Sequence, residues 1–170
     1  MPFRDAAKVA DIDWSAWQAK DTATLMFVFR GDEVLLIRKK RGLGKGLINA
    51  PGGRVDPGET PEQAAIRELD EEVGLRAEQP KWCGEHRFQF RDGYTMHVHV
   101  YATEQFSGQE IETDEAIPLW FAKDAIPYDE MWADDRHWVP NMLRGELFTT
   151  RSIFDGEAMI DFVLEPASAR

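Results

Sequence analysis

Residues 60–75 are the segment of this chain whose local structure the sequence constrains most. Thr60 suits an N-cap, Pro61 suits the first helical position, and Gln63 completes a capping box. Gly74 is placed to end the helix in a left-handed conformation. The pattern therefore predicts a helix of about three and a half turns between these residues.

Three glutamates crowd one face of that helix. Glu68, Glu71 and Glu72 stand at i, i+3 and i+4, a spacing at which like charges destabilise an isolated helix by roughly a few tenths of a kcal/mol per pair. An apolar stripe beside them would dock the helix onto a sheet, and it consists of Ala65, Ile66, Leu69 and Val73. A run of charges is usually a solvated face, but a carboxylate cluster of this kind is a site for hard cations such as Mg²⁺ or Mn²⁺.

Alternating and apolar runs elsewhere predict two β-hairpins. The first joins residues 22–30 to residues 34–37, and the second joins residues 86–90 to residues 94–103. The other expected elements are a short buried strand at 119–121, a helix from Met131 to Leu143 and a strand at 158–164 that closes the sheet. Strands interleaved with two helices favour an α/β or α+β fold class with a mixed sheet.

The first 20 residues are expected to form an arm outside the main domain. Residues 1–20 mix charges with Trp14 and Trp17, three apart, and predict one turn of helix packed on the body. Residues 21–170 are expected to form one domain, because no repeat or flexible linker divides a chain of this length.

Two histidines share one face of the second hairpin. Met96, Val98 and Val100 point to the opposite face of the same strand. His97 and His99 could ligate a metal together. Polar positions on a half-exposed strand are the favoured interpretation, because no third ligand is suggested nearby.

A basic stretch at residues 38–46 contains five cations and three glycines. It predicts a loop whose flexible backbone and positive charge suit phosphate contact, although an ordinary solvated loop fits as well. The whole chain carries a formal net charge of −11, which argues against a long nucleic acid as the main partner. A small phosphorylated ligand stays compatible with this charge, because divalent metals bridge acidic residues to phosphates.

The single cysteine, Cys83, excludes a disulfide framework within the chain and cannot alone form a structural zinc site. No apolar run has the length of a signal peptide or of a membrane span. A reduced, cytoplasmic location without a membrane partner is therefore expected.

The segment from Gly53 to Leu75 resembles the Nudix box at every defined position of that motif. The matching residues are Gly53, Glu59, Arg67-Glu68-Leu69, Glu71-Glu72 and Gly74-Leu75. The resemblance implies the Nudix fold, an α/β/α sandwich with a mixed β-sheet, so that residues 21–170 would be a single Nudix hydrolase domain. It also implies Mg²⁺-dependent hydrolysis of a nucleoside diphosphate that is linked to another moiety.

Carried over to this chain, the motif assigns metal binding to its glutamates. Glu68, Glu71 and Glu72 look like the ligands, helped by the backbone carbonyl of Gly52 or Gly53. Mg²⁺ is the ion that the family implies, with Mn²⁺ as a possible substitute. Such ions screen phosphate charge and lower the pKa of a bound water.

Four further residues receive roles around this centre. Arg67 and Glu59 resemble the pair that braces the loop and helix of the box, a structural and electrostatic part in catalysis. Lys39 could supply further positive charge to the phosphates. Glu115, just before a strand, is by resemblance a further metal ligand or a candidate general base, and the alternative is an ordinary acidic loop.

Four residues outside the box are candidates for binding a nucleotide base. Asn49 offers amide donors and acceptors, and Trp132 could stack on a purine. Asp134 and Asp135 could bond the Watson–Crick edge, and because two carboxylates facing one base cannot easily both stay ionised, one could hold a proton. The alternative is that one aspartate caps the following helix and Trp132 belongs to the core.

These features coincide with a narrower resemblance, to the MutT-type Nudix enzymes that hydrolyse oxidised purine nucleoside triphosphates, 8-oxo-dGTP among them. It spans about residues 34–165 and implies that the four candidates contact the base and that Lys39 lies at the substrate pocket. Ile48 stands where that group commonly has an aromatic, and Ala50-Pro51 replace a glycine and an aromatic. The pocket wall near Asn49 is therefore expected to differ.

The prediction is a Mg²⁺-dependent pyrophosphatase that converts nucleoside triphosphates, modified purines preferred, to the nucleoside monophosphate and pyrophosphate. Its expected role is sanitation of the nucleotide pool, and its expected state is a monomer. One alternative keeps the box with another substrate, such as a diadenosine polyphosphate, ADP-ribose or an RNA 5′ end. Another is a non-catalytic module that senses nucleotides.

Overall fold

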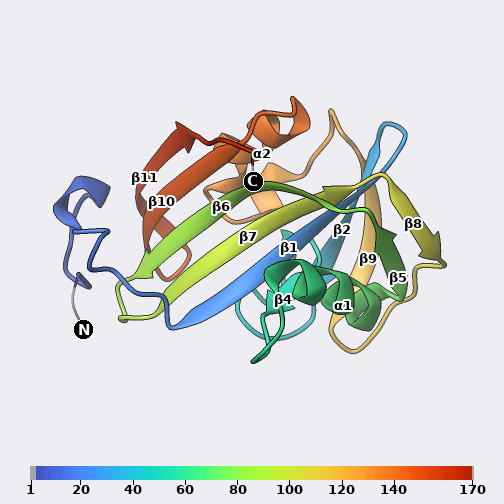
Figure 1. Ribbon diagram of the computed structural model, residues 1–170, viewed down its shortest axis with the longest axis horizontal. Helices are drawn as coiled ribbons and strands as arrows, with labels where there is room; N and C mark the ends of the chain where they lie inside the picture. The colour runs from blue at the N-terminus through green and yellow to red at the C-terminus, as the bar shows by residue number, and fades with distance from the viewer. Residues whose placement is uncertain (1–2, 170) are drawn as a thin grey trace.

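The structure, a computed structural model, describes residues 3–169 and contains the predicted helix as α1 (Pro61–Val73) (Figure 1). Thr60 Oγ1 accepts a hydrogen bond from the Gln63 N–H at 3.1 Å, and the Gln63 side chain accepts one from the Thr60 N–H at 2.9 Å. Gly74 follows with a φ of 75°. The predicted capping box and left-handed C-cap are confirmed.

Within residues 3–169, nine strands form one mixed sheet in the order β11-β10-β6-β7-β1-β2-β3, with β4 beside β1 and β9 beside β2. These strands are β1 (Asp21–Arg30), β2 (Glu33–Lys39), β3 (Ile48–Asn49), β4 (Gly52–Arg54), β6 (Lys81–Phe90), β7 (Thr95–Thr103), β9 (Ala116–Ala122), β10 (Phe148–Asp155) and β11 (Ala158–Pro166). β1 runs parallel to β7, and β6 runs parallel to β10. The other pairs are antiparallel, and β5 (Leu75–Glu78) with β8 (Gln105–Gly108) forms a separate small sheet.

Both predicted hairpins are confirmed. β1 pairs with β2 so that Phe29 lies opposite Val34, and β6 pairs with β7 so that Phe88 lies opposite Met96. The parallel pairing of β1 with β7 then joins the two hairpins into one surface. This junction brings residues from both hairpins to a common site.

The two helices pack on opposite faces of the sheet, as the predicted α/β/α sandwich requires. Met26 of β1 joins the core cluster that contains Leu69 of α1. The next residue, Phe27, joins the cluster that contains Trp138 of α2 (Asp135–Leu143), because successive side chains of a strand point to opposite faces. Figure 1 shows α1 in front of β1 and β4.

Two predicted elements differ in detail. The helix predicted from Met131 begins only at Asp135, because the preceding chain forms a 3₁₀ turn, η2 (Tyr128–Glu130), and then a turn in which the Asp135 N–H donates to the Trp132 carbonyl at 3.1 Å. The strand predicted at 119–121 lies inside β9, but its side chains are half-buried rather than buried. β9 lies at an edge of the sheet beside β2, which explains the partial exposure.

Residues 3–20 pack against β6 and β11 and contain the 3₁₀ turn η1 (Val9–Asp11). The Trp17 indole donates to Gln89 Oε1 at 3.0 Å, and the Val9 N–H donates to Asp161 Oδ2 at 2.7 Å. These contacts fit the expected helical turn, whereas the division of the chain after residue 20 stays a prediction. None of the helices in the described part combines the length and apolar character that crossing a bilayer needs.

Candidate active site

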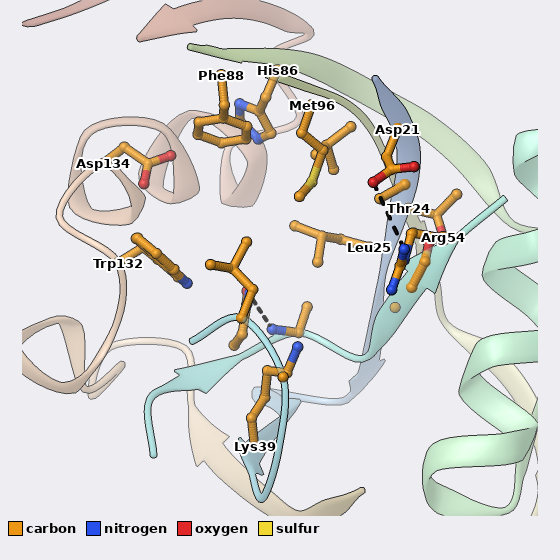
Figure 2. Close-up of a pocket in the computed structure, with 18 of the residues that line it drawn as sticks. Asp21, Thr24, Leu25, Lys39, Arg54, His86, Phe88, Met96, Trp132 and Asp134 are labelled. Carbon is orange, nitrogen blue, oxygen red and sulfur yellow. Dashed lines mark hydrogen bonds and ion pairs between the residues drawn. The ribbon is translucent and has the colours of Figure 1, made fainter. Parts of the chain in front are cut away.

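A cavity of about 560 Å³ opens beside β1, β3, β4 and β7, with the segment that leads into α2 as its far wall. Figure 2 shows Trp132 and Asp134 on one side of it and Arg54 with Asp21 on the other, 3.8 Å apart as an ion pair. Seven predicted site residues line the cavity: Lys39, Asn49, Gly52, Gly53, Trp132, Asp134 and Asp135. The structure therefore brings the two ends of the predicted substrate site to one cavity.

Glu68, Glu72 and Glu115 form a group that could hold a divalent metal ion. One carboxylate oxygen from each lies within 4.8 Å of the others. Glu72 is 5% exposed, and its Oε2 has no hydrogen-bond partner among residues 3–169. Burial, followed by the negative charge of Glu68, raises the pKa of Glu72 to about 8. A divalent cation would be the missing partner of this oxygen, so the three carboxylates fit such an ion.

Glu115 reaches this group through a loop that is tied to α1 and to β2. Thr113 Oγ1 donates to the Glu72 carbonyl at 2.7 Å and accepts from the Glu115 N–H at 3.2 Å. The Lys40 N–H donates to the Glu115 carbonyl at 2.9 Å, and the Arg41 guanidinium donates to the Glu115 carboxylate at 2.8 Å. Contacts on both sides therefore hold this residue beside the C-terminal end of α1.

The two glycines of β4 allow the backbone to pass between β1 and α1. A Cβ at Gly52 would stand 1.8 Å from the Thr24 carbonyl oxygen, so no side chain fits there. Gly53 faces Glu68 on the helix, and its carbonyl accepts a hydrogen bond from Thr24 Oγ1 at 3.3 Å. The Gly52 backbone hydrogen-bonds Glu72 and stabilises its ionised form, which lowers its pKa against the effect of burial. The main chain of β4 thus lies directly against the glutamate group.

Arg67 braces the loop and helix, as the motif implies. Its guanidinium donates to both oxygens of Glu59, at 2.7 and 2.9 Å, and to the Arg54 carbonyl at 3.1 Å. It also donates to Glu68 at 2.9 Å and to Glu71 at 3.1 Å. The hydrogen bonds from Arg67 hold the pKa of Glu59 down at about 2. The predicted ligand Glu71 is therefore placed on Arg67 and lies outside the group formed by the other three glutamates.

Asp134 and Asp135 are both buried at the opposite end of the cavity, with exposures of 2% and 4%. Asp134 Oδ2 accepts a hydrogen bond from the indole N–H of Trp138 at 3.1 Å. Asp134 occupies the N-cap position of α2, yet within residues 3–169 its side chain makes no capping hydrogen bond. Burial raises the pKa of both carboxyls, and the charge of Asp134 raises that of Asp135 further. This pair is therefore suited to hold a proton near neutral pH.

Trp132 and Asn49 lie between the two ends. Trp132 packs edge-on against Phe154, with ring centroids 5.6 Å apart, and it is half-buried rather than part of the closed core. A Cβ at Gly44 would stand 2.9 Å from Trp132 Nε1, so the basic loop lies directly against this ring. Asn49 Oδ1 accepts from the Ala50 N–H at 2.8 Å, which makes the amide NH₂ group the donor that a ligand would meet.

The cations of the basic loop divide between the cavity and the surface. Lys39 lines the cavity, and its charge lowers the pKa of Glu72. Its neighbours form ion pairs with carboxylates of other elements, namely Arg38 with Glu130, Lys40 with Glu112 and Arg41 with Glu115. Lys39 is therefore the cation of this stretch that is placed between the cavity and the glutamate group.

Part of the cavity wall escaped the sequence analysis. His86, Phe88 and Phe90 of β6 line it together with Met96 of β7. Their alternation along β6 marks a common face, which was the available signal, but nothing local shows that a cavity lies on that face. Burial lowers the pKa of His86 to about 3, so this side chain is neutral and contributes a packed polar wall, hydrogen-bonded to Thr150 at 2.5 Å.

Comparison with known proteins identifies the family. The NUDIX domain model matches residues 19–142. The chain is 43% identical over 138 residues to an oxidized purine nucleoside triphosphate hydrolase of Danio rerio, which covers 81% of this chain and 88% of that protein. It is 40% identical over 126 residues to the protein of the same name from Mus musculus, covering 74% and 81% of the two chains. The crystal structure of a MutT protein from Bacillus halodurans superposes with a TM-score of 0.78 at 23% identity, over 85% of this chain and 97% of that one, and shows the same fold. The predicted resemblance is confirmed, and the chain belongs to the NUDIX domain family.

Proposed function

We propose that this NUDIX hydrolase cleaves oxidised purine nucleoside triphosphates, such as 8-oxo-dGTP, to the nucleoside monophosphate and pyrophosphate. The observation that carries the proposal is the buried pair Asp134 and Asp135, which lies at one end of a cavity whose other end is formed by Gly52, Gly53 and Lys39 beside the glutamate group. The curated relatives from Danio rerio and Mus musculus, named for this activity, support it.

The aspartate pair would select the base. One carboxyl that keeps its proton donates a hydrogen bond, while its ionised neighbour accepts one. Oxidation of a purine changes the pattern of donors and acceptors on its edges, and a pair that can do both meets the altered pattern. Trp132 would stack on the ring, and the Asn49 amide would donate to the base from the side of β3.

The glutamate group would hold Mg²⁺, for which Mn²⁺ is the expected substitute. Carboxylate oxygens are the ligands these ions prefer, and Glu68, Glu72 and Glu115 offer three. Glu71 would join them only by turning away from Arg67, its partner at 3.1 Å. When bound, the ion screens the phosphate charge and promotes ionisation of the attacking water. Lys39 would place a further positive charge on the phosphates, and Arg67 would keep Glu68 in position.

The remaining features belong to the same proposal. Residues 21–170 would form the hydrolase domain and residues 1–20 an arm, which the start of the family match at residue 19 supports. The protein would act as a monomer in the cytoplasm and sanitise the nucleotide pool. A sensing module without catalysis is less well supported, because all members of the glutamate group are retained.

The test is a panel of nucleotides incubated with Mg²⁺, with products separated by chromatography. We expect the highest kcat/KM for 8-oxo-dGTP or 2-hydroxy-dATP, with nucleoside monophosphate and pyrophosphate as products. A higher value for ADP-ribose or a dinucleoside polyphosphate would overturn the assignment of the base pocket. Release of inorganic phosphate and a nucleoside diphosphate would overturn the proposed position of cleavage.

A further inference from the structure

Glu85, His97 and His99 form a cluster on the face of β6 and β7 that points away from the nucleotide cavity. Met96 and Val98 line the cavity, and the two histidines alternate with them along β7, so they point to the opposite face. Glu85 of β6 lies opposite His99 in the register of the two strands. The sequence suggested no third ligand for the histidines, and the pairing of β6 with β7 provides one.

The spacing of this cluster is that of a ligand set. Its three donor atoms lie within 4.8 Å of one another. Glu85 Oε2 is 3.4 Å from His97 Nε2 and 3.9 Å from His99 Nδ1. Both distances exceed those of N–H···O hydrogen bonds, which are about 2.7–3.2 Å. In a tetrahedral zinc site with bonds of about 2.1 Å, the ligand atoms stand roughly 3.4 Å apart, close to what is seen here.

Neighbouring residues hold this arrangement. Arg87 Nη1 lies 3.1 Å from Glu85 Oε1, which leaves the second oxygen, Oε2, on the side of the histidines. The indole N–H of Trp82 donates to His99 Nδ1 at 3.4 Å, so the lone pair of the neutral imidazole is on the nitrogen nearest to Glu85. An ion would replace this long hydrogen bond.

The cluster is enclosed but open on one side. Glu85 is 4% exposed and His99 is 8% exposed, whereas the His97 side chain is 22% exposed. His99 also lines a surface cleft with Trp82 and Tyr101. An ion could therefore enter from solvent and keep a water molecule as its fourth ligand.

We propose that Glu85, His97 and His99 bind a transition-metal ion, with Zn²⁺ as the best fit, at a site separate from the glutamate group. Imidazole nitrogen suits Zn²⁺, whereas a group of carboxylates suits Mg²⁺, so the two sites differ in the ions they prefer. The ion links β6 to β7 across the sheet face opposite the nucleotide cavity. Its binding stabilises the fold, since the folded chain alone presents the three ligands together.

The experiment is a Zn²⁺ titration of the full chain in millimolar Mg²⁺ near neutral pH, followed by calorimetry and by the melting temperature. We expect a single Zn²⁺ per chain and a rise in Tm. His97→Gln and Glu85→Gln should each weaken Zn²⁺ binding by about tenfold or more. His137→Gln is the matched control, because His137 is exposed on α2, and it should bind Zn²⁺ as the wild type does.

Two further measurements separate this site from the glutamate group and from misfolding. Glu72→Gln should retain Zn²⁺ binding, because Glu72 belongs to the other group. Side-chain ¹⁵N shifts of the wild type should move at Nε2 of His97 and Nδ1 of His99, which needs no variant to fold. The proposal fails if the wild type binds no Zn²⁺ in Mg²⁺, if folded His97→Gln binds it equally well, or if Glu72→Gln abolishes binding.

Discussion

Gly53 packs so closely against Glu68 that a Cβ at position 53 would stand 2.4 Å from the carboxyl carbon of that glutamate. No side chain can occupy this space unless Glu68 moves, since real Cβ atoms do not approach other heavy atoms so closely. Glu68 is in turn held by Arg67 at 2.9 Å. The glycine therefore determines where one of the proposed metal ligands can lie.

Gly53→Ala is expected to reduce kcat by about 100-fold, because a displacement of one ligand by an ångström disturbs the geometry of the reaction. The measurement is steady-state turnover of the preferred nucleotide in saturating Mg²⁺. Gly145→Ala is the control, since Gly145 has a φ of 77° but no described atom would lie within 4 Å of its Cβ. That variant should lose about 1 kcal/mol of stability through backbone strain and keep full kcat. Equal kcat in both variants would contradict the role of Gly53.

Glu72→Gln is expected to lower kcat by roughly 100-fold or more, because it removes a charged ligand from the glutamate group. In EDTA the same variant should melt at or above the wild-type temperature, since it removes a buried carboxylate without a partner oxygen for its Oε2 in the described chain. Turnover and melting in EDTA are measured in parallel. Asp70→Asn, on an exposed position of the same helix, should change neither quantity. A large fall in the melting temperature of Glu72→Gln would show that its role is structural.

Asp134→Asn and Asp135→Asn are expected to change the ratio of kcat/KM between oxidised and unmodified purine triphosphates by about tenfold, because a fixed amide cannot exchange donor for acceptor. The chemistry at the phosphates should be altered less, since these residues lie at the far end of the cavity. Asp129→Asn serves as the control, because the Asp129 side chain is 95% exposed. An unchanged ratio in both variants would return the pair to a purely structural role.

The same pair predicts a pH dependence of stability. A carboxyl whose pKa is raised in the folded state contributes stability that is present at acid pH and is lost as the pH rises through the folded pKa. The pKa of Asp134 is raised to about 6 and that of Asp135 is raised further, so the wild type loses this contribution as the pH rises from about 4 through 6 and beyond. Asp135→Asn lacks part of the loss, and its Tm should gain on the wild type by about 2–4 °C for each pKa unit removed. Thermal melts at acid and at alkaline pH check this, and a constant difference would contradict it.

The local part of the fold was predictable from sequence. α1 was located correctly because its determinants are short-range: Thr60, Gln63 and Gly74 act on the backbone within a few residues. The Glu59–Arg67 contact was also predictable, although only through the resemblance of the motif, since the two residues lie on different elements. Hairpins formed by neighbouring strands belong to the same class of short-range features.

The long-range part was not predictable in the same way. Asp134 looked like a possible helix cap, but its carboxylate is used by Trp138, whose indole is buried between Phe27 and Phe148. That choice depends on which side chains the sheet packs against α2, which no local pattern states. Glu85 was missed beside the histidines for the same reason, because the register of β6 on β7 decides which residues meet.

β1 contacts β2, β4 and β7 and sends alternate side chains to the two sides of the sheet. Leu25 borders the nucleotide cavity, whereas Met26 packs with the helix that carries the glutamates. Recognition of the base and hydrolysis are thereby inherited on separate surfaces of one strand. Under the proposed function, a lineage of such chains can acquire a new nucleotide by substitutions on one surface while the other stays intact, so new specificity need not pass through an inactive ancestor.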